Sequence, residues 1–213
     1  MSHAPLRLTR PDRGVLFVVS GPSGVGKSTL VRRAMHRIDW LSFSVSATTR
    51  DPRQGEQEGI DYHFVDAPRF EQLVEAGAFL EHATVYDRRY GTLAEPTEAA
   101  LGEGRCLLLD IDVQGARQVK EHLDDAVHLF VLPPSLDALE QRLRARGTDS
   151  EHTIARRMEQ VALQLQGAEE AHYVVVNDDL EAAHACFEAV LLAESCRRRR
   201  RERAVRAVLP PRA

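Results

Sequence analysis

The sequence has little of what marks secreted, zinc-binding or membrane-spanning proteins. Among 213 residues it has only 3 cysteines, Cys106, Cys186 and Cys196, without a C-x-x-C spacing. This odd number excludes a closed disulfide framework, and we expect free thiols in a reducing cytoplasm. The histidines form no H-E-x-x-H motif, so no protein-bound zinc is expected. No apolar run approaches the roughly 20 residues that cross a bilayer, and residues 1–13 lack the apolar region of a secretory signal.

Neither sign of charge dominates the chain, because the formal net charge is −4 with 28% charged residues. This balance provides no global field that would recruit nucleic acid or a membrane surface, and we expect neither as a partner. The exception is the arginine run at residues 197–201. We interpret it as a solvated helix end that leads into a basic tail, with contact to RNA or an acidic partner as the alternative.

The most informative stretch matches the pattern G-x-x-x-x-G-K-[ST] at residues 21–28, between an apolar run at 15–19 and an amphipathic helix. Glycines let consecutive backbone N–H groups point inward, and the helix N-terminus adds partial positive charge. Lys27 would reach the outer phosphates of a nucleotide, and the Ser28 hydroxyl would ligate Mg²⁺. The alternative is a glycine-rich turn that happens to carry a lysine, which the flanking strand and helix disfavour. The predicted phosphate site comprises Gly21, Pro22, Ser23, Gly24, Val25, Gly26, Lys27, Ser28 and Thr29.

Apolar segments that alternate between strand and helix patterns predict an α/β fold, with a parallel sheet flanked by helices on both faces. Residues 44–92 do not follow this alternation, because they are richer in strands and turns, with one turn expected at 88–92. We interpret them as an inserted mixed β lobe. The predicted organisation is a flexible leader at 1–13, a core at 14–43, 93–138 and 168–196, the lobe at 44–92, a helical lid at 139–167 and a basic tail at 197–213.

Two carboxylates and two arginines outside the glycine loop are candidates for phosphoryl-transfer chemistry. Asp110 ends an apolar strand, where an acid in nucleotide enzymes of this type holds Mg²⁺; the alternative is an aspartate that caps the next helix. Asp112 is two residues further on and would serve Mg²⁺ or a second ligand. Arg146 and Arg157 flank a break at Gly147 and would clamp a transferring phosphoryl group, unless they form one charged helix face.

A polar loop after residue 46 offers a second phosphate site. Arg50 and Arg53 lie three residues apart, and guanidinium groups bind phosphate through two parallel hydrogen bonds. Tyr62 and Tyr90 would add hydroxyl donors. The alternative is a solvated loop with surface arginines and core tyrosines.

Taken together these segments resemble the guanylate kinase family. The likeness runs in order from about residue 14 to residue 197. It is carried by residues 44–50, 52–56, 59–65, 79–83, 90–92, 109–115, 146–148 and 176–179.

The resemblance implies transfer of the γ-phosphoryl group of ATP to GMP, and also to dGMP, with Mg²⁺, in purine nucleotide metabolism. The reaction would need no general base, because the attacking phosphate oxygen is already ionised, and a lid and the lobe would close around the substrates. Glu81 would accept hydrogen bonds from N1–H and the exocyclic amine of guanine, a donor pair that adenine lacks. The family is typically monomeric or dimeric.

The resemblance also assigns residues by matching position. The guanine readers are Ser46, Glu81 and Thr92, and the GMP phosphate ligands are Arg50, Arg53, Tyr62 and Tyr90, supported by Asp112. The catalytic cations are Lys27, Arg53, Arg146 and Arg157, the metal ligands are Ser28 and Asp110, and Asn177 and Asp178 lie beside adenine.

The sequence departs from the family at Asp87, Arg88 and Arg89, where a Gly-Asn-Tyr sequence is usual. We expect Arg89 to point into solvent, with an added phosphate contact as the alternative. Two other functions stay open at this point: a binding module of the same fold that no longer catalyses, and a kinase for another phosphorylated acceptor.

Overall fold

The computed structural model describes residues 10–85, 87–145 and 151–209. The central strands are β1 (Leu16–Ser20), β2 (Leu41–Phe43), β7 (Cys106–Asp110), β8 (Val127–Leu132) and β9 (Tyr173–Val176). They form a parallel sheet in the order β2-β7-β1-β8-β9, which confirms the predicted α/β class. The carboxyl ends of parallel strands meet at one edge, so the segments that follow β1 and β7 lie side by side there.

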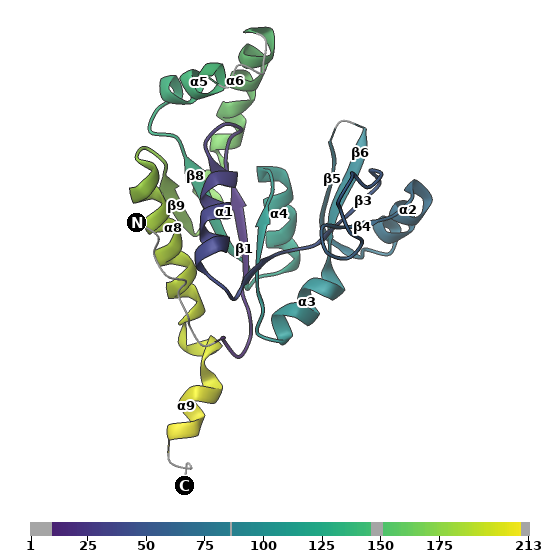
Figure 1. The fold of residues 1–213 in the computed structure, drawn as a ribbon, viewed down its shortest axis with the longest axis vertical. Helices are drawn as coiled ribbons and strands as arrows, with labels where there is room; N and C mark the ends of the chain where they lie inside the picture. The colour runs from purple at the N-terminus through teal and green to yellow at the C-terminus, as the bar shows by residue number, and fades with distance from the viewer. Residues whose placement is uncertain (1–9, 86, 146–150, 210–213) are drawn as a thin grey trace.

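Helices cover both faces of this sheet (Figure 1). They are α1 (Lys27–Arg37), α3 (Ala94–Gly102), α4 (Val113–His122) and α8 (Leu180–Ser195). Successive side chains of β1 point to opposite faces. Phe17 joins the core formed with α1 and α8, whereas Leu16 and Val18 join the core formed with α3 and α4. The strand before the glycine loop is therefore buried on both sides, as its apolar run predicted.

A second sheet, at residues 46–93, forms the lobe. Its elements are β3 (Ser46–Thr48), β4 (Tyr62–Phe64), α2 (Ala67–Glu75), β5 (Phe79–Val85) and β6 (Arg88–Leu93). The strand order is β4-β3-β6-β5, and the pairing is mixed because β3 and β4 are parallel while the other pairs are antiparallel. The predicted turn at 88–92 is wrong: this segment is β6, which pairs with a strand on each side.

The chain passes from one sheet to the other at residues 44–45. The strand before this point, β2, belongs to the central sheet, and the strand after it, β3, belongs to the lobe. Residues typical of helix ends flank α2, the helix that follows β4. The Asp66 side chain accepts a hydrogen bond from the Arg69 N–H at 2.8 Å and caps the N-terminus, and Gly77 follows the C-terminus with φ of 62°.

Three further helices, α5 (Leu136–Ala145), α6 (Glu151–Leu165) and α7 (Gly167–Glu170), connect β8 to β9. Figure 1 shows α5 and α6 extending beyond the loop between β1 and α1. No helix among the described residues is long and apolar enough to cross a membrane.

The C-terminal segment differs from expectation. After α8 the chain forms a short 3₁₀ turn (Arg198–Arg200) and then α9 (Glu202–Val208). The arginine run is not simply a solvated helix end, because Arg200 is only 1% exposed and pairs with Asp125 at 2.8 Å. Tertiary contact with the loop before β8 therefore buries one member of the run.

Candidate functional site

The glycine loop wraps around a cavity at the carboxyl edge of the central sheet. Gly21, Gly24 and Gly26 have positive φ values of 142°, 91° and 100°, which other residues rarely adopt. The Lys27 ammonium donates to the Gly21 carbonyl at 2.8 Å, so the lysine folds back over the loop. The cavity, of about 530 Å³, is lined by Pro22, Ser23, Gly24, Gly26, Lys27, Ser28, Thr29, Arg32 and Asp110.

Asp110 reaches this cavity because β7 runs parallel to β1, with Asp110 in register with Val19. The Ser28 hydroxyl donates to the Asp110 carboxylate at 3.3 Å. Burial raises the pKa of Asp110, while the nearby Lys27 and the Ser28 hydrogen bond act in the opposite direction. The structure thus brings together the two residues expected to ligate a metal ion, although they lie far apart in the sequence.

This pair of oxygen donors fits Mg²⁺, which prefers carboxylate, hydroxyl and water oxygens and usually takes further ligands from substrate phosphates. Within the described ranges no group of three or more His, Cys, Asp or Glu side chains is placed to hold a metal ion alone. The site is therefore chemically suited to a metal ion that arrives with a phosphate-bearing ligand.

A second cavity, of about 390 Å³, adjoins the loop on the side of β9. Asn177, which is buried, donates from its side-chain amide to the Val25 carbonyl at 2.7 Å. Arg142 on α5 donates to the carbonyls of Asn177 at 2.8 Å and Asp178 at 3.3 Å. Sequence reasoning missed Arg142 because it resembled one member of a charged helix face. The lining residues are Gly24, Val25, Gly26, Thr29, Arg142, Ala145, Asn177, Asp178 and Leu180.

Of the two arginines expected to clamp a phosphoryl group, one can be placed. Arg157 on α6 donates to the Ser23 hydroxyl at 3.4 Å, so it reaches the glycine loop from a helix more than a hundred residues away in sequence. Arg146 lies outside the described residues.

The expected base-reading residues lie next to one another across the lobe sheet. Ser46 pairs with Thr92, and Thr92 with Glu81, so the three side chains share one face. Glu81 is 5% exposed and accepts a hydrogen bond from the Thr92 hydroxyl at 2.7 Å. Burial raises the pKa of Glu81; the Thr92 hydrogen bond opposes this and the charge of Asp112 adds to it. A buried carboxylate with one oxygen held by Thr92 is a specific acceptor for a polar ligand.

Arg50 and the two tyrosines form a cluster on the same lobe. The Arg50 guanidinium lies 5.3 Å from the centre of the Tyr62 ring, and the rings of Tyr62 and Tyr90 are 6.1 Å apart. Glu56 accepts two hydrogen bonds from Arg50, at 2.8 and 2.9 Å, and this pairing raises the pKa of Arg50. Sequence reasoning did not single out Glu56. Arg53 lies on this loop with an exposed side chain, and its backbone N–H donates to Glu56.

Asp112 has the role that was considered as the alternative for Asp110. Its side chain accepts from the Gly115 N–H at 2.8 Å and caps the N-terminus of α4. A Cβ atom on Gly115 would lie 3.1 Å from a carboxylate oxygen of Glu81, a tight contact that would require the carboxylate to shift. The capped end of α4 therefore lies close to the Glu81 carboxylate.

The departure at residues 87–89 alters the turn between β5 and β6 and its contacts. Asp87 adopts φ of 62°, the left-handed conformation that a glycine would take without strain. Arg89 does not point into solvent, as was expected: its guanidinium lies 4.5 Å from the centre of the Phe70 ring and pairs with Glu71 on α2. These contacts direct Arg89 onto α2 of the lobe, where it stacks on a buried ring.

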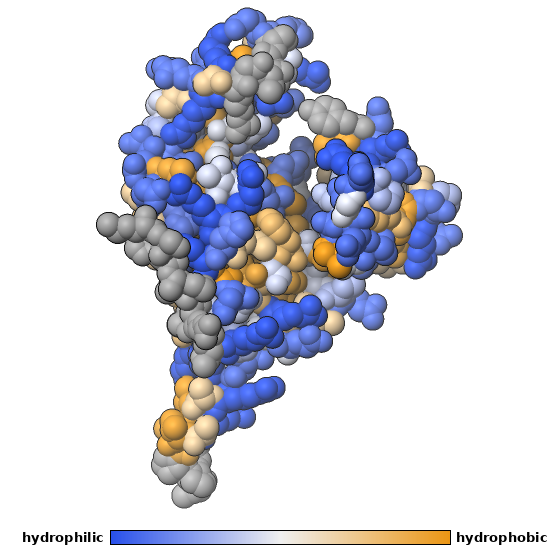
Figure 2. Space-filling model, in the orientation of Figure 1, coloured by the Kyte–Doolittle hydropathy of each residue, from blue (hydrophilic) through white to orange (hydrophobic). Residues whose placement is uncertain are grey.

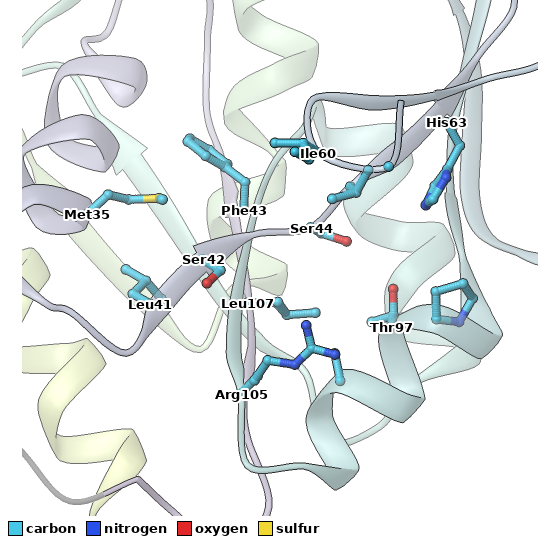
Figure 3. Close-up of a pocket in the computed structure, with 14 residues that line it drawn as sticks. Met35, Leu41, Ser42, Phe43, Ser44, Ile60, His63, Thr97, Arg105 and Leu107 are labelled. Atoms are coloured by element: carbon cyan, nitrogen blue, oxygen red, sulfur yellow. The ribbon is translucent and has the colours of Figure 1, made fainter. Parts of the chain in front are cut away.

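A groove of about 530 Å³ separates the lobe from the core at the crossing between β2 and β3. Figure 3 shows Ile60 and His63 of the lobe across from Leu41, Phe43 and Leu107 of the core. Figure 2 shows the surface hollowed between the lobe and helices α5 and α6. The groove therefore lies beside residues 44–45, where the chain passes from the core to the lobe.

Comparisons with known proteins agree with this geometry. The family model described as guanylate kinase matches residues 13–194. The chain is 48% identical over 189 residues to a guanylate kinase of Chromohalobacter salexigens, across 89% of this chain and 87% of that protein. It is 45% identical over 201 residues to a guanylate kinase of Zymomonas mobilis, across 94% of this chain and 92% of that protein. A crystal structure of guanylate kinase from Anaplasma phagocytophilum matches with a TM-score of 0.70 at 31% identity, covering 96% of this chain and 100% of that chain. The glycine loop, the β lobe and these likenesses agree, and the chain belongs to the guanylate kinase family.

Proposed function

We propose that the two cavities at the glycine loop bind ATP and that the lobe binds GMP, so that the two nucleotides meet between Lys27 and Arg50. As a guanylate kinase, the protein is an enzyme that catalyses ATP-dependent phosphorylation of GMP to GDP. The observation that carries the arrangement is the buried Glu81 carboxylate, held by Thr92 on a lobe separate from the loop.

On the donor side, the backbone N–H groups of residues 21–29 bind the phosphates, and adenine enters the cavity beside Asn177, Asp178 and Arg142. The buried amide of Asn177 supports this assignment by holding the loop itself. Ser28 and Asp110 would hold Mg²⁺ through oxygen atoms. When bound, the ion neutralises charge on the phosphates.

On the acceptor side, the free oxygen of Glu81 and the oxygen bonded to Thr92 face a guanine base, with Ser46 beside them. Arg50, Tyr62 and Tyr90 bind the GMP phosphate, and the exposed Arg53 side chain on the same loop turns toward it on binding. The assigned contacts involve base and phosphate and leave the ribose 2′-hydroxyl unread, which supports dGMP as a second acceptor.

The chemical step needs positioning and charge neutralisation and no general base. An ionised phosphate oxygen of GMP attacks the γ-phosphorus in line, the bond from that phosphorus to the β,γ-bridging oxygen breaks, and ADP leaves. Lys27, Arg157, Arg146 and Arg53 balance the negative charge that spreads over the transferring group. The contact between Arg157 and Ser23 supports closure of α5 and α6 as a lid over the loop.

A coupled assay of ADP release with GMP, dGMP, AMP and UMP as acceptors tests the proposal. We expect turnover with GMP and dGMP, and Lys27→Met should reduce it by about 100-fold or more while the protein stays folded. Equal rates with AMP and GMP would contradict the role of Glu81. Retained activity in Lys27→Met would contradict the role of the loop.

We also propose a cytoplasmic location. The cysteines Cys106, Cys186 and Cys196 are free thiols in the structure, which suits a reducing compartment. Burial raises the pKa of Cys106 to about 11, so this thiol is unreactive.

A further inference from the structure

A side chain of α4 forms paired hydrogen bonds with the outer edge strand of the lobe sheet. β5 is the edge strand of its sheet, with β6 on one side only. At His82 the backbone N–H donates to the Gln118 side-chain oxygen at 3.0 Å, and the Gln118 amide donates to the His82 carbonyl at 3.2 Å. Gln118 is on α4, so its amide pairs with β5 as a neighbouring strand would.

The residue on the other side of Glu81 is held to the same helix. Leu80 is 3% exposed and packs in the core cluster that includes Ala116 and Val119 of α4. Glu81 therefore lies between two residues that are both attached to α4, one by apolar packing and one by paired hydrogen bonds. The close approach of Gly115 to its carboxylate oxygen completes the contact.

We infer that Gln118 is a positioning residue for guanine recognition: its side-chain amide holds β5 against α4 so that both oxygens of Glu81 reach the base. The inference rests on the proposed role of Glu81 as the guanine reader. Nothing in the proposed mechanism requires Gln118 to touch substrate, and its effect is transmitted through the backbone of His82.

The chemistry of the base makes this position sensitive. Guanine offers N1–H and an exocyclic amine side by side, and a carboxylate accepts from both only when its plane is aligned with them. Hypoxanthine, the base of IMP, keeps N1–H and lacks the amine. A carboxylate that has lost its alignment gives up the second hydrogen bond first, so the preference for GMP over IMP reports on the position of Glu81.

The test compares kcat/KM for GMP and for IMP in Gln118→Met, which removes both hydrogen bonds at similar side-chain length. We expect the GMP-to-IMP preference to fall by about 10- to 100-fold, as for a small misplacement of a binding group, with KM for ATP unchanged. Gln118→Glu still accepts a hydrogen bond from the His82 N–H, so its GMP-to-IMP preference should lie between those of the wild type and Gln118→Met. If Gln118→Met does not fold, Gln118→Glu provides the test. Gln72→Met, the same change on the exposed face of α2, is the matched control and should leave the preference unchanged.

Combination with Glu81→Gln separates this inference from the proposed function. If Gln118 acts through Glu81, the double variant Gln118→Met with Glu81→Gln has the same GMP-to-IMP preference as Glu81→Gln alone. An unchanged preference in both Gln118 variants, or losses that multiply in the double variant, would overturn the inference. If Glu81→Gln alone leaves the preference unchanged, it is instead the assignment of Glu81 as guanine reader that fails.

Discussion

The pair formed by Arg200 and Asp125 closes the C-terminal segment onto the core, and its removal should have an asymmetric cost. The Arg200 guanidinium is 1% exposed and donates to both carboxylate oxygens of Asp125, at 2.8 and 3.2 Å, and to the Gly14 carbonyl at 3.2 Å. Asp125 is different, because its side chain is 31% exposed and also pairs with Arg199 at 2.5 Å. Burial lowers the pKa of Arg200, and the charge of Asp125 opposes this.

The magnitudes follow from which group is left without a partner. Asp125→Ala leaves a buried cation, and such a change generally costs about 3–5 kcal/mol. Water has partial access to the position that Asp125 vacates, so we expect a loss of about 3 kcal/mol in the free energy of unfolding. Arg200→Met leaves a carboxylate that water and Arg199 still satisfy, so the loss is about 1.5 kcal/mol, the lower end of the range for lost hydrogen bonds to a charged group. In the double variant no buried charge remains, so it should be more stable than Asp125→Ala alone.

Urea unfolding of the wild type and the three variants, followed by circular dichroism at pH 7, measures these differences. The kcat of each folded variant serves as control and should be unchanged, because the pair lies outside the proposed nucleotide sites. The reasoning is refuted if Asp125→Ala costs less than Arg200→Met, or if the two losses add in the double variant.

Three other predictions follow from single positions. Gly115→Ala places a Cβ 3.1 Å from the Glu81 carboxylate; KM for GMP should rise about 10-fold or more while KM for ATP stays the same, as for a displaced binding group, and parallel changes in both constants would contradict this. Gly26→Ala places an alanine at a φ of 100° and its Cβ 2.5 Å from the Asn177 side-chain amide. The free energy of unfolding should therefore fall by about 1–3 kcal/mol in a thermal or urea melt, and KM for ATP should rise. Burial, and then the charges of His172 and Lys120, lower the pKa of His128 from 6.5 to about 4; His128 is thus neutral when folded, and about 3 kcal/mol of stability should be lost as pH falls from 6.5 to 4. His128→Phe should flatten this dependence, and an equal slope in both proteins would exclude the histidine as its source.

Much of the fold was predictable because its signals are local. The glycine loop needs positive φ at fixed spacings, and the apolar runs before and after it mark buried strands and a packed helix face. Asp66 and Asp112 are each followed within three residues by the N–H that they cap. Such features depend on neighbours in the chain.

Other features depend on pairing between distant segments. Residues 88–93 carry no strong strand signal, and β6 forms because β3 and β5 lie on either side of it. Arg89 belongs to a polar stretch, and only the nearby α2 provides the Phe70 ring on which it stacks.

The sequence by itself predicted a nucleotide phosphate site after the first strand, an alternation of strands and helices around it, and an inserted segment of different character at residues 44–92 with paired arginines and tyrosines. Only the tertiary structure decided that Arg200 is buried, that Arg142 joins Asn177, and that Gln118 holds the strand of Glu81. The physical reason is that backbone conformation and apolar periodicity act over a few residues, whereas the partner of a polar side chain depends on which distant segment the folded chain places within hydrogen-bonding distance.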